Sequence, residues 1–418
     1  MREVVITGLG LVSPIGVENA DFFRALCEGR SGVGVLDELR ETPLASRIGA
    51  RVGEFNAKEH VKPRKNIKVM SHDIQMGFVA ADRAWIDSGA RDGAIDPERL
   101  GVVFGADLIA VDLVELERAY RRCAPEGVFD GALWGPAAMD EMFPLWMLKY
   151  LPNMPACHVG IGRDGRGPNN SVTVERASGL TALAEAVRVI QRGQADAMIA
   201  GCTSSRIHPQ VWAKEDAYPL SRRVDDPAAA CRPFDADRDG TVHGEGAAAV
   251  VLEERTLALR RGARPLATVC GLAATYQPRL PGQPPRPEAI CRAIRGALAD
   301  ARTAPDKIGH VNADGMGTVD DDRAEAAAIR EVLGDVPVTA PKGNFGNLGA
   351  GAGLVELAAS LLGLQNGVVP PTRNYQTPDP QCPINVVRDR PLEGAPATAL
   401  VLNQSRMGHS VAVILAKA

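Results

Sequence analysis

The chain has 418 residues, of which 45% are hydrophobic and 23% are charged, and its formal net charge is −4. This length is enough for a large buried core and for two domains or two fused halves. The slightly acidic balance argues against a general attraction to nucleic acid or to an anionic membrane surface. Only 4% of the residues are aromatic, which also argues against base stacking. We therefore expect neither nucleic acid nor a membrane as a partner.

The N-terminal half, which we assign to residues 1–255, alternates between buried-type strands and amphipathic helices. An insertion at about residues 110–168 carries scattered Trp and Pro without a clear period, and we expect it to form a lid with one helix. The predicted strands are Val4–Gly8, Arg99–Phe104, Ser171–Val174, Ala197–Ala200 and Ala247–Leu252, and the predicted helices are Asn19–Cys27, Val69–Ser88 and Ser178–Arg192.

The C-terminal half, residues 256–418, repeats this order of elements. Strands that alternate with helices build an α/β sheet with right-handed crossovers, so two similar halves predict a duplicated α/β/α/β/α sandwich. The predicted strands are Leu266–Cys270, Ile308–Ala313, Val336–Thr339, Thr398–Asn403 and Val411–Leu415, and the predicted helices are Glu288–Ala301, Asp322–Leu333 and Leu354–Gln365.

The eight cysteines are scattered without any Cys-x-x-Cys pair, so the sequence predicts neither a metal site nor a disulfide framework. Reduced thiols fit a cytoplasmic protein. The first residues lack a basic leader followed by a long apolar stretch, and no run approaches the ~20 apolar residues of a membrane span. We expect a cytoplasmic protein without a metal or another cofactor.

The run Val174-Glu175-Arg176-Ala177-Ser178-Gly179 leads from a strand into a helix, which is the geometry of a nucleophile on a strand-to-helix turn. A thiol at this place would be activated, because the positive end of the helix dipole favours a thiolate. Arg176 can be neither nucleophile nor base, since it stays protonated and offers only donors. The framework is that of a catalytic site, and its reactive group is missing.

Several stretches together resemble the β-ketoacyl-acyl carrier protein synthases, or ketosynthases, the condensing enzymes of fatty acid and polyketide biosynthesis. The most specific is Arg232-Pro233-Phe234-Asp235-Ala236-Asp237-Arg238-Asp239-Gly240, which runs on to Gly244-Glu245-Gly246-Ala247. The resemblance implies a thiolase-like five-layer αβαβα sandwich built from two βαβαβαββ halves, almost always as a dimer. The other stretches are Val4–Gly10, Ser13–Gly16, Pro152–Met154, Gly167–Asn169, Lys342–Gly353 and Val368–Thr372.

The family's active cysteine and two histidines correspond, by this resemblance, to Arg176, Asp314 and Asn347. The family lysine is retained as Lys342, and the carboxylate of the helix after the first histidine is retained as Glu325. Arg176 removes the nucleophile. An ionised Asp314 would repel the enolate that a histidine donor stabilises. We therefore expect that the chain does not run ordinary condensation alone.

A buried arginine without a partner would be costly, so we expect Arg176 to pair with Asp314, with Glu175 as a competitor for the arginine. The pair either plugs a retired pocket or belongs to a reassigned active site. Chain-length factors are silent family members that pair with an active ketosynthase. They resemble this chain at Ala313–Gly315 and at Asp322–Ala326, but they usually carry glutamine at the cysteine position.

Three functions stay open at this point. The first is a non-condensing, chain-length-factor-like subunit that forms a heterodimer with an active ketosynthase. The second is an enzyme with altered chemistry, namely decarboxylation or acyl transfer without a cysteine adduct, which would need a raised pKa at Asp314 or a donor amide at Asn347. The third is a homodimer that binds acyl groups or carrier protein without turnover.

The resemblance implies acyl carrier protein, with its phosphopantetheine-linked acyl chain, as the partner. Of the family's two pantetheine-binding threonines, one is Thr318 and the other is replaced by Met316. Arg406 and His409 lie on the C-terminal loop expected beside the pocket. A dense basic cluster either docks the acidic carrier or is a solvated face. The cluster consists of Lys62, Arg64, Lys65 and Lys68.

Overall fold

The computed structural model describes residues 2–42, 44, 46–91, 93–214, 219–280, 282–394 and 397–418. Its first half contains five main strands in the spatial order β5-β4-β6-β7-β1. Strands β4, β5 and β6 pair in parallel, whereas β7 is antiparallel to both β6 and β1. Their bounds are β1 (Val4–Val12), β4 (Leu100–Ala106), β5 (Asn169–Val172), β6 (Ala197–Ser205) and β7 (His243–Glu254).

The second half repeats this pattern with the order β10-β9-β14-β15-β8. Counted along the chain, both halves place their strands in the order third, second, fourth, fifth, first. The parallel and antiparallel pairs also fall at the same places. The bounds are β8 (Ala267–Tyr276), β9 (His310–Asn312), β10 (Pro337–Thr339), β14 (Thr398–Gln404) and β15 (His409–Lys417).

The two halves meet edge to edge, where Val5 and Ile6 of β1 pair with Thr268 and Ala267 of β8. One hydrogen-bonded sheet of thirteen strands results, because β12 (Asn385–Val386) joins β10, β3 (Ile48–Ala50) joins β7, and β2 (Val33–Val35) joins β3. Strands β11 (Val368–Val369) and β13 (Leu392–Glu393) form a separate pair.

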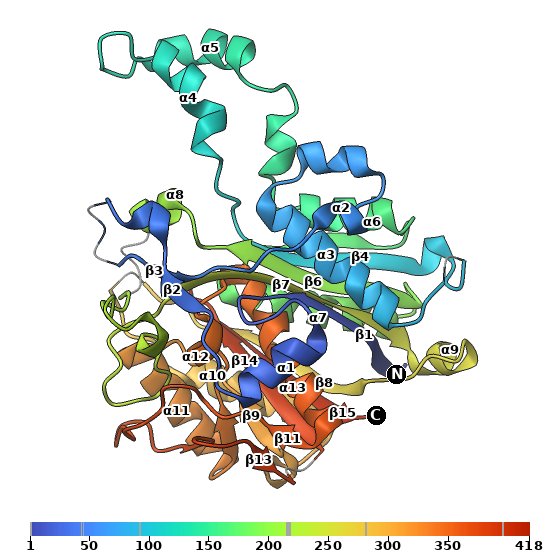
Figure 1. The fold of residues 1–418 in the computed structure, drawn as a ribbon. Coiled ribbons are helices and arrows are strands. Elements are labelled where there is room, and N and C mark those ends of the chain that lie inside the picture. The colour runs from blue at the N-terminus through green and yellow to red at the C-terminus, as the bar shows by residue number, and fades with distance from the viewer. Residues whose placement is uncertain are drawn as a thin grey trace.

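Helices fill the space between the two halves of the sheet and cover both outer faces, which gives five layers (Figure 1). The middle layer holds α7 (Ser178–Gln191) and α13 (Ala352–Asn366), and α13 is buried continuously from Ala352 to Leu364. Outer helices α3 (His72–Asp87) and α6 (Met154–Gly162) cover the first half, and α10 (Pro287–Ala301) and α11 (Val319–Leu333) cover the second. The predicted thiolase-like sandwich is confirmed.

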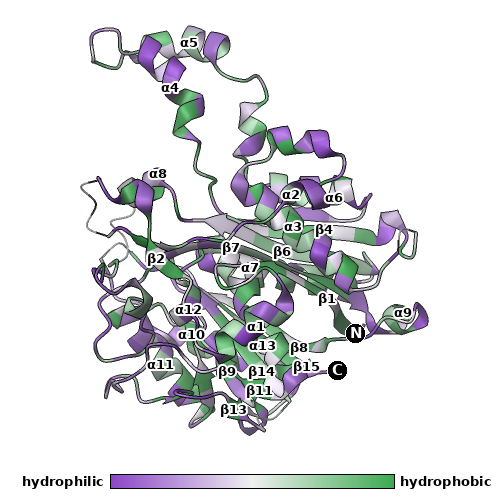
Figure 2. Cartoon of the chain, in the orientation of Figure 1, coloured by the Kyte–Doolittle hydropathy of each residue, from purple (hydrophilic) through white to green (hydrophobic). Residues whose placement is uncertain are grey.

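Burial explains the sequence pattern of these layers. All nine residues of β1 are buried, as a strand with helices on both faces requires. Helix α13 is apolar around its whole circumference because it has a sheet on either side, while outer helices such as α10 keep a polar face (Figure 2). Glu356 is an exception to this pattern, because it is a charged residue that is buried within the apolar helix α13.

The insertion differs from the expectation of one helix, because it holds three: α4 (Leu113–Arg122), α5 (Trp134–Glu141) and α6. Helices α4 and α5 project from the body as an arm, which we define as residues 108–149 (Figure 1). The arm packs its own small core around Leu116, Ala119 and Met142. Two short helices in a Pro-punctuated stretch give too little periodicity to be read from the sequence.

Short helices complete the described part of the chain. The α-helices are α1 (Asn19–Cys27), α2 (Ala57–His60), α8 (Pro209–Lys214), α9 (Arg255–Arg260) and α12 (Lys342–Phe345). The 3₁₀ helices are η1 (Asp37–Leu39), η2 (Arg64–Val69), η3 (Pro97–Arg99), η4 (Gly131–Leu133), η5 (Trp146–Lys149), η6 (Glu175–Ala177), η7 (Pro227–Ala229), η8 (Pro305–Lys307) and η9 (Gly349–Gly351). Within the described ranges, every helix is too short or too polar to cross a lipid bilayer.

Candidate functional site

Arg176 lies in η6, directly before the N-terminus of α7, and its side chain is only 1% exposed. The turn is held by Ser178, whose hydroxyl accepts a hydrogen bond from the Val174 backbone N–H at 2.8 Å. The positive end of a helix disfavours a nearby cation, and burial adds a desolvation cost. The guanidinium therefore needs a carboxylate close by.

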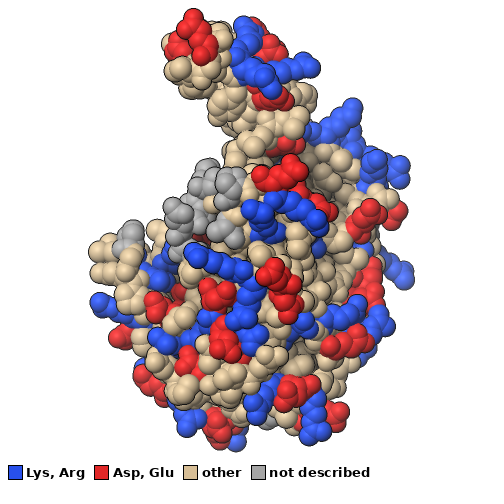
Figure 3. Space-filling view, turned by 60° about the vertical axis from the view of Figure 1, so that its left-hand side comes forward, with Lys and Arg blue, Asp and Glu red and all other residues tan. Residues whose placement is uncertain are grey.

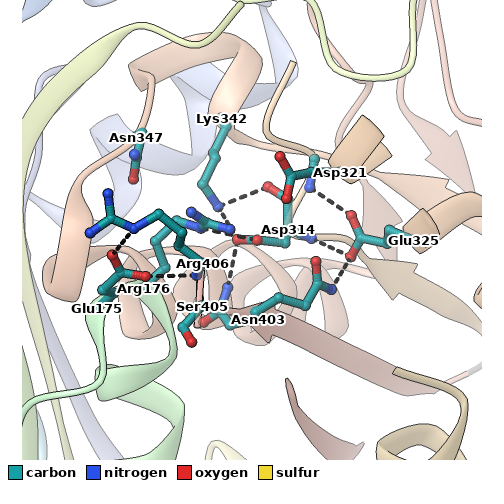
Figure 4. Close-up of polar contacts among 12 residues, drawn as sticks. Glu175, Arg176, Asp314, Asp321, Glu325, Lys342, Asn347, Asn403, Ser405 and Arg406 are labelled. Carbon is teal, nitrogen blue, oxygen red and sulfur yellow. Dashed lines mark hydrogen bonds and ion pairs between the residues drawn. The ribbon is translucent and has the colours of Figure 1, made fainter. Parts of the chain in front are cut away.

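Asp314 supplies that carboxylate from the segment that follows β9. Its Oδ2 accepts a hydrogen bond from Arg176 Nε at 3.1 Å, and its side chain is fully buried (Figure 4). The predicted Arg176–Asp314 pair is confirmed, across 138 positions of sequence.

Lys342 and Glu356 extend this pair into a larger buried charge network. Lys342 Nζ donates to Asp314 Oδ1 at 2.6 Å and to the Asp314 backbone oxygen at 2.8 Å, and it forms a second ion pair with Glu356. Asn403 donates to Glu356 Oε2 at 2.6 Å and to Asp314 Oδ1 at 3.3 Å. Two cations and two carboxylates thus alternate along one chain of contacts, in the order Arg176, Asp314, Lys342 and Glu356.

Neighbouring charges shift the pKa values of Asp314 and Lys342 toward their ionised forms. Burial opposes ionisation of Asp314, but the charges of Arg176 and Lys342 outweigh it and lower the pKa of Asp314 below its usual value. Burial likewise opposes the charge of Lys342, and Asp314 and Glu356 overcome it, so the pKa of Lys342 is raised. A raised pKa at Asp314, one of the two alternative conditions for an enzyme with altered chemistry, is therefore not met, which leaves the Asn347 amide.

Glu325, on α11, holds the backbone beside this network. Its two oxygens accept the N–H groups of Asp314 and Gly315, each at 2.8 Å, and Gln404 Nε2 donates to it at 2.9 Å. Burial, followed by the charge of Asp314, raises the pKa of Glu325 to about 8. Gly315 has a φ of +47°, and a Cβ there would lie 2.6 Å from the Cβ of Ala340, so only glycine fits this turn.

Asn347 stands apart from the charge network. Its Oδ1 accepts the Gly349 N–H at 3.0 Å, while its buried Nδ2 has no hydrogen-bond partner among the described residues. In Figure 4 no dashed line reaches it. The three positions that the resemblance assigns to the family triad therefore contain one ion pair, Arg176 with Asp314, and one separate amide.

Glu175 does not compete for Arg176 as its main contact, because it engages the loop between β14 and β15. Its Oε2 accepts the Arg406 backbone N–H at 2.6 Å, and its Oε1 lies 3.3 Å from Arg406 Nε. Glu175 adopts a left-handed φ of +54°, which is unfavourable for a residue other than glycine. The carboxylate thereby ties the loop to the start of α7.

A cavity of about 790 Å³ opens beside Glu175. Among the described residues that line it, Glu175 and Arg406 are present and Arg176 is not. Apolar side chains form much of its wall, including two from η5 on the arm. The apolar lining residues include Leu108, Ile109, Trp146, Met147, Leu151 and Val211.

The two positions that the resemblance assigns to the pantetheine-binding threonines are closed to solvent. Thr318 is 2% exposed and Met316 is 1% exposed. The Thr318 hydroxyl donates to Asp321 Oδ2 at 2.7 Å, and Arg279 pairs with the other oxygen of Asp321 at 3.0 Å. Thr318 is thus already engaged within its own chain.

His409 and Arg406 share a loop but line different cavities. His409 Nδ1 lies 3.3 Å from the Ser405 hydroxyl, and its ring packs against Tyr276 with a centroid separation of 4.7 Å. His409 borders a hollow of only about 40 Å³, whereas Arg406 borders the cavity of about 790 Å³.

The basic cluster at η2 and the residues before it is exposed, and η2 contacts η5 at the base of the arm. Figure 3 shows Lys and Arg side chains gathered on the body near that base. The cluster therefore lies on the same side of the fold as the arm. Its members are Lys62, Arg64, Lys65 and Lys68.

Sequence reasoning missed several polar residues of the site. Glu356 was detectable as a single charge within the apolar stretch Leu354–Leu364. Asn403 follows four apolar residues near the end of β14, which is a weaker signal. Asp107 and Arg206, a pair with 3.7 Å between Oδ2 and Nη1, follow β4 and β6 and carried no signal of their own.

Comparisons with known proteins agree with this architecture. The model of the β-ketoacyl synthase N-terminal domain matches residues 1–258, and that of the C-terminal domain matches residues 266–376. The tetracenomycin polyketide synthase ketoacyl synthase alpha subunit of Streptomyces glaucescens is 35% identical over 425 aligned residues, covering 100% of this chain and 97% of the relative.

Two solved structures share the fold over the whole chain. AntDE:AntF, a type II PKS acyl-carrier protein in complex with its ketosynthase bound to the hexaketide, matches with a TM-score of 0.84 and 29% identity, covering 100% of this chain and 99% of the other. The ishigamide ketosynthase/chain length factor matches with a TM-score of 0.84, 25% identity and the same coverage. The chain belongs to the β-ketoacyl synthase family of fatty acid and polyketide biosynthesis.

Proposed function

We propose that this chain is a non-condensing member of its family, in which Arg176, Asp314 and Asn347 occupy the positions of the cysteine and the two histidines. The observation that carries the proposal is the state of Arg176: it is 1% exposed and bonded to Asp314 at 3.1 Å. A guanidinium offers only donors and cannot accept an acyl group. Lys342, the lysine that the resemblance identifies with the family lysine, belongs to the charge network. Glu325 holds the backbone beside that network.

No thiol in the described structure takes the place of the missing nucleophile. Cys202, on β6 against the start of α7, is fully buried and contacts the Gly351 backbone oxygen at 3.1 Å. Burial raises the pKa of Cys202 to about 12, so it stays a thiol at neutral pH. No cysteine is among the described residues that line the cavity beside Glu175.

We further propose that the chain acts as a chain-length-factor-like subunit beside an active ketosynthase, with acyl carrier protein as the shared partner. The solved complexes of similar proteins with a carrier protein and with a chain length factor support this, as does the exposed basic cluster. The division of the chain at residues 255 and 256 follows the repeat of strand order in the two halves.

Reconstitution tests this function. The purified chain is incubated with acyl- and malonyl-carrier protein, alone and together with a ketosynthase that has an intact cysteine and both histidines. We expect no condensation product from the chain alone, and a stable complex with altered product length when the active enzyme is present. Condensation by the chain alone would refute the proposal. A homodimer that does not bind the active ketosynthase would instead favour the third hypothesis, a protein that binds acyl groups or carrier protein without turnover.

Asn347 keeps a second function open, namely decarboxylation of a malonyl unit. Its buried Nδ2 has no hydrogen-bond partner among the described residues, so it can donate to a developing negative charge. Carbon dioxide release from malonyl-carrier protein, compared between the native chain and Asn347→Leu, measures this activity. Release no higher than a protein-free control would rule it out.

A further inference from the structure

A second cavity, of about 460 Å³, lies at the base of the arm beside the one that Glu175 borders. The start of α3, the end of β6 and the first turn of α4 contribute to its lining. Among the described residues that line it, four carry carboxylates and only two are lysine or arginine. We call it the acidic cavity. Its carboxylates belong to Asp73, Asp112, Glu115 and Glu245.

The lysine and the arginine of the acidic cavity are paired at its rim. Lys149 forms an ion pair with Glu115 on the arm, and Arg51 forms one with Glu38, which is not among the described residues of the lining. The side chains of both pairs are at least 20% exposed. These positive charges therefore belong to the solvent-facing part of the cavity.

Two carboxylates lie deeper, on either side of Ser205. The Ser205 N–H donates to Asp73 Oδ1 at 2.6 Å, and the Ser205 hydroxyl donates to Glu245 Oε2 at 2.7 Å. Only 9% of Asp73 and 5% of the Glu245 side chain are exposed. Among the described residues, neither carboxylate pairs with a lysine or an arginine, and no other residue donates to Asp73 Oδ2. Asp73 thus offers one carboxylate oxygen to the cavity.

One imidazole is the only cationic partner that these two carboxylates have among the described residues. His72 Nε2 lies 3.3 Å from Glu245 Oε2, and the His72 side chain is 50% exposed. Burial opposes the charge of His72, but the contact with Glu245 outweighs burial and raises its pKa above the usual value. Burial also raises the pKa of Asp73 to about 6, against the charge of His72. At neutral pH a half-exposed imidazole therefore faces two buried carboxylates, which leaves negative charge uncompensated.

The space fits an organic cation. A volume of about 460 Å³ lies within the roughly 300–1,000 Å³ of small-molecule pockets. Met70, Ile207 and Tyr150 add apolar surface to the lining. Within the part of the chain that the structure describes, no group of three or more His, Cys, Asp or Glu side chains is arranged to hold a metal ion. A molecule with an apolar body and one positively charged end would satisfy both kinds of surface.

We propose that the acidic cavity binds a small organic molecule through a primary ammonium group that donates to Asp73 Oδ2. An ammonium group has three N–H donors, and its hydrogen bonds to a carboxylate are about twice as strong as those between neutral groups. The inference goes beyond the proposed function and does not depend on it. None of the three positions that the resemblance assigns to the family triad is among the described residues of this lining.

Nuclear magnetic resonance titration of the full chain with 2-phenylethylamine at neutral pH tests the proposal. The Ser205 amide, which donates to Asp73, reports on the site, and the Leu9 amide, which donates to Asp87 at 2.9 Å, is the internal control. The comparators 2-phenylethanol and 3-phenylpropanoate carry a neutral and a negative end on the same ring. We expect the amine to shift the Ser205 amide and to bind about tenfold more tightly than either comparator. Equal affinities for the amine and the alcohol, or a shift at Leu9 alone, would overturn the proposal.

A matched pair of substitutions on α3 locates the ammonium group. Asp73→Asn removes the charge but keeps an oxygen for the Ser205 N–H, so it should weaken the binding of the amine about tenfold and leave that of the alcohol unchanged. Asp87→Asn, at the other end of the same helix and outside the described lining, should change neither affinity. Similar losses in the two variants, or an unchanged affinity in Asp73→Asn, would refute the site.

His72→Gln gives a second test that leaves the two buried carboxylates in place. The variant removes the imidazole that competes for Glu245, so the amine should bind more tightly than it does to the native chain. Weaker binding of the amine to this variant would contradict the argument from charge and overturn the proposal. This measurement remains decisive if Asp73→Asn does not fold.

Discussion

Arg176 and Glu175 are neighbours in sequence, yet they lie in opposite surroundings. Arg176 is 1% exposed and closes a buried network with Asp314, Lys342 and Glu356. Glu175 borders a cavity of about 790 Å³ and holds the loop at Arg406. The position that the resemblance assigns to the family nucleophile is thus closed by an ion pair, while its neighbour in sequence borders an open cavity. Two adjacent residues thus have different roles in the structure: one stabilises the buried network, and the other holds a loop beside the cavity.

The largest expected effect on stability comes from removing a charge from the buried network around Arg176. Arg176→Met removes one cation and leaves Asp314 and Glu356 with Lys342 alone, which should lower the free energy of unfolding by roughly 3–5 kcal/mol. Urea denaturation measures it. Arg295→Met breaks an exposed pair with Glu331 and should change the stability little, so an equal loss in both variants would contradict the role of burial.

A smaller effect follows when both partners are neutralised. Arg176→Met combined with Asp314→Asn leaves Lys342 and Glu356 as a balanced pair. The double variant should therefore lose less stability than the sum of the single variants, by roughly 0.5–3 kcal/mol. Unfolding free energies of the four proteins in one double-mutant cycle give this value. Strict additivity would mean that the two charges do not interact.

The pH dependence of stability reports on Glu325. Its folded pKa is about 8, above the unfolded value of about 4.3, so the folded state binds the proton more tightly. Stability from this group should fall as pH rises from about 4.3 to 8 and should level off above that range. Glu325→Gln should remove this slope in urea denaturation between about pH 5 and 8. An unchanged slope would assign it to other groups.

The contribution of Asp314 to stability has the opposite pH dependence, because Arg176 and Lys342 lower its folded pKa. Its contribution should be fully present above the unfolded pKa of about 3.9 and should disappear as pH falls through the folded value. The acid limb of the same stability profile should therefore flatten in Asp314→Asn.

The smallest expected effect on stability comes from weakening the contact between Glu175 and Arg406. Glu175→Gln weakens the tie to the partly exposed Arg406, so global stability should change by less than about 1 kcal/mol. Hydrogen exchange at the Arg406 amide should become faster, because that N–H donates to the carboxylate. The Gly408 amide, which donates to the Ser405 backbone oxygen, is the internal control. Equal acceleration at both amides would mean that the whole loop has opened.

Much of the fold could be predicted from the sequence, because its elements carry local signals. Apolar runs such as Val4–Gly8 and the helical period of Ser178–Arg192 mark buried strands and helices directly. Strand β5 begins and ends two residues earlier than predicted, since the turn at Glu175 takes up the residues before α7. The number of helices in the arm was underestimated because α4 and α5 pack mainly on each other and not on the main core.

The site was predictable only where a family motif or an unusual residue marked it. The Arg176–Asp314 pair followed from two charges at positions that face each other in the family. Glu356 and Asn403 were missed because their contacts join segments far apart in the chain. The pairing of Glu175 with Arg406, 231 positions away, depends on a loop conformation that no sequence period encodes.

The most direct test of the central claim is intact-protein mass spectrometry after incubation with an acyl-carrier thioester. An active ketosynthase with its cysteine serves as the positive control and should gain the mass of the acyl group. We predict no mass gain on this chain, because Arg176 cannot accept the acyl group and Cys202 is buried as a thiol. A stoichiometric acyl adduct on the chain would contradict the account.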